Sequence, residues 1–393
     1  MSLSSGYIKS NSMVLHGKCV VAQTFHADAA WTFAGQSSAT PLTKDSFEKT
    51  GTGGAASLFS RFTLTLPGGA QTSYNQANHY RNAVIPHALS AEYFNDLRQT
   101  EHAGNVKVNP ATDPKNLTCF FTTVVDIPCL TSQQALPMLL MSGGLSLEIV
   151  TASVSEAFYA IQNEVTSYTL SELSLIYEVV QVTPEFKSAL VAAKAQNPYL
   201  IHVNDRMCIG PTAFIATTRM NVGLGLSSMK GVVFTALLQD SLTVSLAKPK
   251  CYGNAGMVNF ALYNNGQIFS IPNMTSDDVV FTEMQRCIGR IHDSNITSYL
   301  IAEKNTTLTS RRNNYNLGQF LAGCSCETVD DWSFSSQGVP CDQLAIEING
   351  GTGQDANMWQ AAQAQNTQHN LYLWVFYDSI LVINPDGTCQ IRK

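Results

Sequence analysis

The chain has 393 residues and a net charge of −6, and only 13% of its residues are charged, against roughly 25% in an average globular domain. No run of basic residues is longer than two, as at Arg311–Arg312, which argues against a protein that coats nucleic acid directly, because such a protein needs many phosphate-neutralising cations. The shortage of charge favours a surface that is mostly covered by partners. A neutral extracellular surface rich in Ser, Thr and Asn is the alternative.

The N-terminus predicts a short polar arm over residues 1–12, because these residues are small and polar. They lack the apolar core of a secretory signal peptide. No apolar run of the chain reaches the ~18 residues that a transmembrane helix needs. We therefore expect the chain to be made and folded in the cytosol.

The first half of the chain reads as strands separated by loops, with one helix. In residues 61–66, for example, Phe62, Leu64 and Leu66 alternate with polar residues, as in a strand with one buried face, and Pro67–Gly69 then turns the chain. The predicted strands are 13–25, 61–66, 117–127, 145–150 and 172–182, the loops are 26–57 and 100–116, and the helix is 91–99 with Ser90 as its N-cap.

The strand 172–182 is unusual because both of its faces are apolar. Leu173, Leu175 and Tyr177 point to one side, and Ile176 and Val180 point to the other. Apolar residues on both faces are typical of a strand that is covered on both sides. We therefore expect this strand to be buried.

A helix between the two halves is predicted over residues 184–198. Thr183 serves as N-cap, Pro184 and Glu185 suit the first turn, and Asn197–Pro198 ends the helix. We expect this linker helix to pack between two domains, with Leu190 and Val191 in apolar surroundings.

The second half repeats the same kinds of element. An Asn264–Gly266 turn follows the predicted strand 257–263. Ser276 then caps a helix whose apolar residues recur at spacings of three and four. The predicted elements are strands 199–203, 231–238, 241–247 and 257–263 and the helix 277–291.

Three pairs of segments suggest that the two halves are copies of one β-rich unit. The last strands share an aromatic–acid pair, Tyr177–Glu178 and Tyr377–Asp378, at an offset of 377 − 177 = 200 residues. LSLEI at 145–149 matches LAIEI at 344–348, with 344 − 145 = 199, and Phe62 matches Phe260, with 260 − 62 = 198. A repeat at a nearly constant offset indicates duplication. The expected domains are an arm at 1–12, a first unit at 13–183, a linker helix at 184–198 and a second unit at 199–393.

No motif in the sequence predicts a catalytic, cofactor-binding or metal-binding residue. The Cys324, Cys326 and Cys341 cluster lacks a fourth ligand at the spacing of a zinc site, so we interpret it as buried, reduced thiols. His26 near Asp28 is typical of a solvated loop, and the adjacent acids Asp330–Asp331 point to opposite faces if they lie in a strand. We therefore expect a protein that is not an enzyme.

Several segments in this order resemble the double jelly-roll major capsid proteins of tailless icosahedral DNA viruses, a group that includes adenovirus hexons and the capsid proteins of virophages and polinton-like viruses. The segments are SLFSRFTLTLPGG, IPCLTSQQALPMLLMSGGLSLEIV, SYTLSELSLIYEVVQVTPEF, LSSMKGVVFTALL, VNFALYNNGQIFSIPNMTSDDVVFTEMQRCI and FYDSILVINPDGTCQI. The resemblance implies an all-β fold of two tandem eight-stranded jelly-roll barrels, with a short helix in each barrel and the linker helix between them.

The same resemblance implies a virion shell protein, made in the host cytoplasm and assembled as pseudo-hexagonal homotrimers. Its expected partners are neighbouring trimers, vertex (penton) and minor capsid proteins, and either an internal lipid membrane or a separate basic protein, without direct contact to nucleic acid. A sugar-binding or hydrolytic β-sandwich protein, such as a spike or a lectin, is the alternative. Lectins seldom need a helix in each unit, so the duplication with its linker helix favours the capsid protein.

Overall fold

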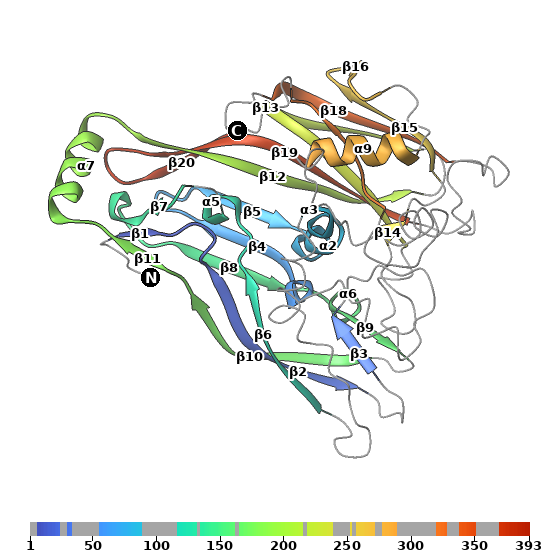
Figure 1. The fold of residues 1–393 in the computed structure, drawn as a ribbon, viewed down its shortest axis with the longest axis horizontal. Helices are drawn as coiled ribbons and strands as arrows, with labels where there is room; N and C mark the ends of the chain where they lie inside the picture. Colours follow the sequence, from blue (N-terminus) through green and yellow to red (C-terminus); the bar gives the residue numbers. More distant parts are fainter. Residues whose placement is uncertain are drawn as a thin grey trace.

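The computed structural model describes most of the chain and shows a mainly β protein whose two halves lie side by side (Figure 1). Among the described residues, no helix has the length and apolar character needed to cross a bilayer. The described residues are 6–23, 30–33, 55–88, 116–131, 134–161, 165–214, 218–238, 252–253, 257–271, 277–288, 320–327, 338–350 and 369–393.

The first half forms four small antiparallel sheets with the strand orders β11-β1-β7, β10-β2-β6, β3-β9 and β5-β4-β8. Its strands are β1 (Gly6–Ile8), β2 (Val14–Gln23), β3 (Ala30–Phe33), β4 (Phe59–Thr65), β5 (Gln71–Asn75), β6 (Asn116–Val124), β7 (Leu136–Pro137), β8 (Ser146–Thr151), β9 (Phe158–Ile161), β10 (Val165–Ile176) and β11 (Val179–Gln181). Its helical segments are η1 (Ala55–Leu58), α2 (Ala77–Ala83), α3 (Ile85–Ala88), α5 (Pro128–Thr131), η2 (Met138–Leu140) and α6 (Val154–Ala157).

The second half is built on one nine-stranded sheet in which β12, β19, β13, β18, β15 and β16 follow one another. In the same sheet, β14 and β17 pair with β13, and β20 pairs with β19. Its elements are β12 (Tyr199–Phe214), β13 (Thr218–Leu238), β14 (Tyr252–Gly253), β15 (Met257–Asn264), β16 (Gln267–Ile268), α9 (Asp277–Cys287), β17 (Ala322–Ser325), β18 (Val339–Gly350), β19 (His369–Ile383) and β20 (Cys389–Arg392).

Strand pairing confirms the internal duplication. In the first half Phe62 of β4 lies opposite Ile149 of β8, and in the second half Phe260 of β15 lies opposite Ile348 of β18. These are the matched residues of the two sequence echoes, so each copy pairs the same two strands in the same register. Because a one-residue shift would turn every side chain to the other face of the sheet, a shared register indicates a shared core.

The segment predicted as one strand at 172–182 is interrupted and largely exposed, so the prediction that it is buried on both faces is wrong. Strand β10 ends at Ile176, and β11 begins at Val179 in a different sheet. Ile176 is 53% exposed and Val180 is 46% exposed. The apolar pattern on the outer side of this segment therefore does not come from the core of a single chain.

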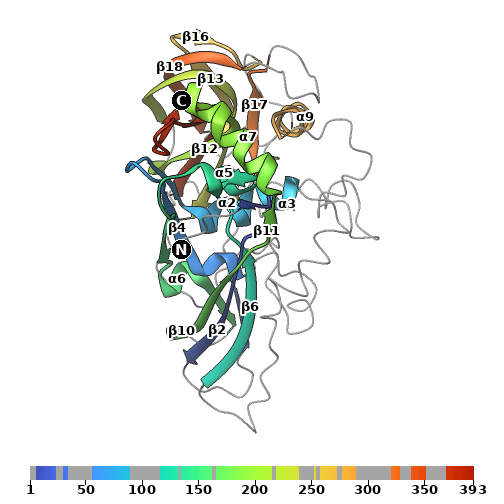
Figure 2. The ribbon, with the colours of Figure 1, turned by 90° about the vertical axis from the view of Figure 1, so that its left-hand side faces the viewer.

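The linker helix is present as α7 (Pro184–Gln196), at one end of the molecule, where it joins β11 to β12 (Figures 1 and 2). The Thr183 hydroxyl accepts a hydrogen bond from the Phe186 amide at 3.4 Å, as predicted for an N-cap. Leu190 packs against the core of the first half, but Val191 is 45% exposed. The expectation that Val191 lies in apolar surroundings is therefore wrong.

Two further expectations are changed by the strand pairing and the helices. Gly6–Ile8, within the predicted arm, forms β1 and pairs with β11 and β7. The predicted helix at 277–291 is present as α9 and ends at Cys287. The predicted helix 91–99 and strand 241–247 lie outside the described residues.

The buried side chains form three apolar clusters. The first fills the first half but includes Ile201, Leu381 and Cys389 of the second half, which ties the two halves together. The second fills the second half between its paired strands. The third lies between the halves and joins Tyr80 of α2 with Trp374 of β19. The strand count in each half does not by itself establish two eight-stranded barrels, which remain a prediction.

Candidate functional site

A buried carboxylate, Asp205, is the centre of the junction between the two halves. It lies on β12, and only 3% of its surface is exposed. Its oxygens accept hydrogen bonds from the hydroxyls of Tyr74, Tyr377 and Ser379 at 2.8, 3.1 and 3.3 Å. They also accept one from the backbone amide of Arg206 at 2.8 Å. Because Tyr74 comes from β5 of the first half, one buried charge joins both halves.

The neighbouring Arg206 balances this buried charge and reaches into the first half. Its guanidinium lies 3.0 Å from the Asp126 carboxylate and donates a hydrogen bond to the Asp126 carbonyl at 2.9 Å. It also stacks over Tyr80 at 4.0 Å and lies 5.4 Å from the centre of the Tyr74 ring. Burial alone would lower the pKa of Arg206, but Asp126 raises that pKa above its ordinary value, so the guanidinium stays charged.

Burial and the nearby Asp205 carboxylate raise the pKa of Tyr74 well above its ordinary value. Burial and Asp205 raise the pKa of Tyr377 in the same way. Both hydroxyls therefore stay protonated and act as donors to Asp205. The arrangement suits a structural clamp, because every group of it is already paired inside the protein.

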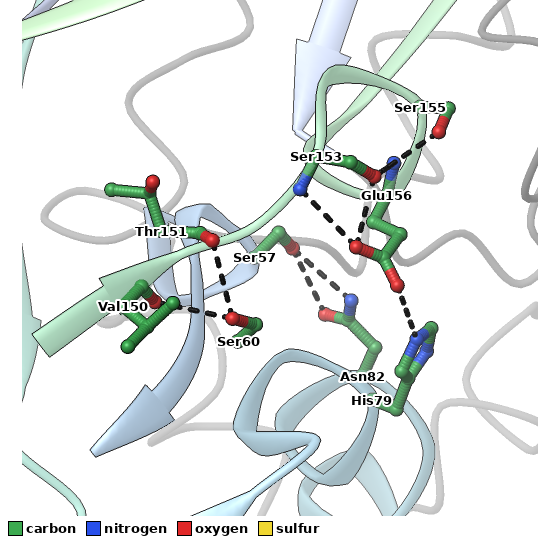
Figure 3. A network of polar contacts seen from close by, with 9 residues as sticks. All are labelled: Ser57, Ser60, His79, Asn82, Val150, Thr151, Ser153, Ser155 and Glu156. Carbon is green, nitrogen blue, oxygen red and sulfur yellow. Dashed lines mark hydrogen bonds and ion pairs between the residues drawn. The ribbon is translucent and has the colours of Figure 1, made fainter. Parts of the chain in front are cut away.

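A second polar network joins α2, α6 and η1 in the first half (Figure 3). Ser153 and Glu156 form a capping box at the start of α6, and the other carboxylate oxygen of Glu156 lies 3.6 Å from His79 Nε2. One turn along α2, the amide of Asn82 exchanges hydrogen bonds with the Ser57 hydroxyl at 3.1 and 3.3 Å. The interaction with His79 outweighs burial and lowers the pKa of Glu156 to about 2.

This second network also reaches the second half. His79 is buried, and its ring lies 4.5 Å from the ring of Tyr372 on β19. Helix α2 therefore presents one face to α6 and another to the second half of the chain. Like the first network, it orients elements against each other.

The cysteine cluster is buried, as predicted. Cys324, Cys326 and Cys341 belong to the core of the second half, and the eight cysteines whose side chains the structure describes are all free. Burial raises the pKa of Cys324 to about 12 and the pKa of Cys341 to about 11, so both thiols are protonated at neutral pH. The described residues contain no group of three or more His, Cys, Asp or Glu placed to hold a metal ion.

The other residues that the sequence raised lie elsewhere in the chain. His26, Asp28, Arg311–Arg312 and Asp330–Asp331 all fall outside the described residues. The junction residues Asp205, Arg206 and Asp126 were missed. A usable signal was present for two of them, because Asp205–Arg206 places two charges in the middle of the long strand β12, where charges are rarely buried without partners.

A cleft of about 430 Å³ lies in the second half between β13 and β18. Arg219, Asn221 and Gln343 line it, together with the backbone of Gly223 and Gly266. The Arg219 guanidinium lies 3.6 Å from Glu347 and 5.3 Å from the centre of the Tyr263 ring. Such amide and guanidinium groups can hydrogen-bond a polar ligand.

The most prominent surface feature of the described chain is a set of exposed large apolar side chains. The larger group belongs to the first half, to α7 and to the start of β12, and the smaller group lies in β16, just after it and in α9. They are Phe120, Leu173, Ile176, Val179, Val180, Phe186, Val191 and Leu200 in the larger group, and Ile268, Ile271 and Val279 in the smaller group. Large exposed apolar patches mark sites of protein or membrane contact.

Comparison with family models found no match, and no curated protein matches by sequence. Solved structures match over the whole chain. The PBCV-1 virus capsid structure aligns with a TM-score of 0.60 at 11% identity, covering 100% of this chain and 91% of that one. The chain has the fold of viral major capsid proteins.

Two further structures show the same capsid fold. The cryo-EM structure of the Sputnik virophage aligns with a TM-score of 0.57 at 10% identity, covering 99% of this chain and 83% of that one. The mavirus major capsid protein aligns with a TM-score of 0.55 at 6% identity, covering 100% and 85%. The double jelly-roll resemblance seen in the sequence is therefore confirmed at the level of the fold.

Proposed function

We propose that this chain is a major capsid protein that builds an icosahedral virion shell. The observation that carries the proposal is the length of the match, because 100% of the chain aligns with a solved capsid structure of which it covers 91%. An alignment of this extent includes both halves and the linker helix together. The solved structures that it resembles are shell components, which favours a structural role over catalysis.

The assembled unit is a pseudo-hexagonal homotrimer of two eight-stranded jelly rolls per copy. Two observations support it: only 13% of the residues are charged, and the outer strand β10 is apolar but exposed in the single chain. Interfaces bury apolar residues and are depleted in charge. The same reasoning explains why the sequence pattern of 172–182 is that of a covered strand.

The partners of the shell follow from the same proposal. Trimers contact neighbouring trimers, vertex proteins and minor capsid proteins, and their inner side meets a lipid membrane or a separate basic protein. Direct contact with the genome is not part of the proposal, because the chain has 23 Lys and Arg against 29 Asp and Glu. The protein is made in the host cytoplasm and resides in the virion.

Sedimentation and negative-stain microscopy of the purified protein test the proposal. The capsid function predicts trimers at micromolar concentration, with a hexagonal outline in projection. A soluble monomer over the whole concentration range, without shells or trimers, would contradict it.

A carbohydrate-binding protein is the second candidate, and the cleft lined by Arg219, Asn221 and Gln343 is the observation that favours it. Planar amide and guanidinium groups can satisfy sugar hydroxyls. A glycan array followed by calorimetry tests this candidate. Binding that Asn221→Ala and Gln343→Ala both abolish would support it, and an array without signal would remove it.

A further inference from the structure

The chain turns back after β19 and forms β20 against the end of the same strand (Figure 1). The backbone amide of Asn384 donates a hydrogen bond to the Thr388 carbonyl at 2.8 Å and closes the turn. The Asp386 carboxylate accepts further hydrogen bonds from the amide and the hydroxyl of Thr388, at 2.9 and 2.7 Å. We name residues 384–392, which comprise this turn and β20, the strap. Its turn is therefore held by hydrogen bonds within the strap itself.

The place of the strap in the internal repeat is taken by a different element in the first half. At the offset that relates Tyr177 to Tyr377, 377 − 177 = 200 residues, the strap corresponds to residues 184–192, which lie in α7. The segment after the equivalent strands is thus a linker helix in one copy and a returning strand in the other. Because the two copies differ here, the shared fold of a single unit does not require the strap.

The strap docks on the first half of the chain through its backbone. The Cys389 amide donates a hydrogen bond to the Pro67 carbonyl at 2.7 Å, and the Gly387 carbonyl accepts one from the Ser142 amide at 3.0 Å. The Cys389 side chain is buried and belongs to the first core cluster, and Ile391 packs against that cluster. The strap therefore completes the core of a half to which it does not belong in sequence.

The strap fits closely against the turn that follows β4. A Cβ atom placed on Gly68 would lie 2.9 Å from the Thr388 Cβ, nearer than two carbon atoms pack. A Cβ atom placed on Gly69 would meet no atom of the described chain within 4 Å. The two glycines have similar positive φ angles, 89° and 84°, so an added side chain strains the backbone similarly at either position. A methyl group on Gly68 therefore displaces the strap, and the same group on Gly69 does not.

Helix α7 reaches the same segment of the first half as the strap. Lys194 of α7 donates a hydrogen bond to the Leu140 carbonyl, and Ser142, two residues further along, donates one to the strap. The two segments that follow the equivalent strands therefore meet at one place. A short segment at the edge of a fold can open locally at a lower free energy than global unfolding requires. An open strap would leave α7 as the remaining link at this place.

We propose that the strap closes over the first half in a separate conformational step, and that a chain with an open strap does not assemble. The second part of this inference rests on the proposed homotrimer. Closing the strap completes the first core cluster and fixes the two halves against each other. A building block whose halves are fixed loses less conformational entropy on association than one whose halves move. The strap thus admits to the shell only chains in which both halves are folded.

Thiol labelling of Cys389 measures the opening of the strap within the folded full chain. Cys389 is buried, so N-ethylmaleimide reacts with it only while the strap is open, and mass spectrometry distinguishes its peptide from that of the buried Cys341. Gly68→Ala should raise the labelling rate of Cys389 at least tenfold above that of Gly69→Ala, its matched control. Equal rates in these two variants would overturn the strap. An equal rise at Cys341 would overturn it as well, because the opening would then be global.

A second pair of variants tests the strap from its own side and without backbone strain. Ile391→Ser removes packing against the first core cluster, and Gln390→Ser changes the exposed neighbour as its control. Ile391→Ser should also raise the Cys389 rate at least tenfold above its control. Circular dichroism establishes that each variant is folded, and this pair decides the outcome if Gly68→Ala does not fold. Indistinguishable rates from Ile391→Ser and Gln390→Ser would contradict the proposal.

Sedimentation of the same variants tests the link to assembly. Gly69→Ala and Gln390→Ser should form trimers like the wild type, whereas Gly68→Ala and Ile391→Ser should need at least tenfold higher concentration. Trimers of normal stability from a variant whose Cys389 is labelled rapidly would refute the link between the strap and assembly. A wild-type chain that stays monomeric would refute the homotrimer and that link together. The labelling rates would still decide whether the strap opens by itself, because they are measured on the single chain.

Discussion

At the scale of single residues, two acids, one buried and one partly buried, connect elements that are far apart in the sequence. Asp205 accepts hydrogen bonds from both halves, and Glu156 links α6 to His79 of α2 (Figure 3). Both are acids whose partners already lie inside the protein. Removing one partner of such a group leaves the others desolvated and unpaired, which costs more than the net value of the original bond.

Asp205→Asn should therefore destabilise the chain by about 3 kcal/mol, the typical cost of breaking a buried charge network. The amide offers hydrogen-bond donors to the hydroxyls of Tyr74 and Tyr377, which donate in the native protein. Urea unfolding at one protein concentration measures the loss. The exposed Asp342→Asn is the control and should change the free energy of unfolding by less than ~0.5 kcal/mol. Equal effects of both variants would contradict the role of Asp205.

The lowered pKa of Glu156 predicts how the free energy of unfolding depends on pH. Its pKa falls from 4.5 to about 2 on folding, chiefly through the interaction with His79. A depressed folded-state pKa means that the ionised carboxylate stabilises the fold above its unfolded pKa. This contribution is lost as the pH falls from about 4.5 to 2. The stability difference between the wild type and Glu156→Gln should shrink over that range in urea titrations, whereas a difference independent of pH would rule out the link.

At the scale of elements, local residues determine where helix α7 begins, and contacts with distant residues determine where it lies. Its start is set by Thr183, whose side chain caps the first turn, and Pro184 suits the first helical position. Its position is set by contacts further along. Lys194 donates a hydrogen bond to the carbonyl of Leu140, and Leu190 packs on the first core cluster. The rest of the helix faces outward at one end of the molecule (Figure 2).

Three substitutions in α7 should therefore have graded effects on the free energy of unfolding. Thr183→Ala should cost about 1 kcal/mol through the lost cap. Leu190→Asp should cost more, because it places a charge against the core, while Val191→Asp should stay within ~0.5 kcal/mol. Thermal and urea unfolding provide the measurement. A large loss in Val191→Asp at concentrations below assembly would show that α7 is covered within the single chain.

At the scale of the whole molecule, the balance of charge bears on contact with nucleic acid. The net charge is −6, and the described N-terminal segment has only Lys9 and Lys18 as cations, each of which is already paired with a glutamate, Glu178 and Glu172 respectively. A surface of this kind cannot release many counterions from a duplex.

The assembled protein should therefore bind duplex DNA negligibly at physiological salt. A gel-shift titration of the purified protein measures this, with a basic DNA-binding protein as the positive control. Binding at submicromolar concentration that weakens steeply with added salt would contradict the prediction and indicate direct contact with the genome.

Much of the architecture could be predicted from the sequence, because its signals are local or repeated. Alternation in 61–66 predicted β4, and the cap and proline at Thr183–Pro184 predicted α7. The echoes of Phe62 in Phe260 predicted the duplication, since two copies of one unit must repeat the same periodic pattern.

The tertiary structure alone decided which apolar and charged side chains are covered, and by what. Periodicity shows that the outer side of 172–182 is apolar, but only the packing shows that Ile176 is bare while the equivalent face of β19 lies under α2. Likewise, Asp205 reads as an isolated charge until Tyr74, 131 positions earlier, is placed beside it. Burial and pairing depend on contacts between distant segments, and a local pattern carries no record of those contacts.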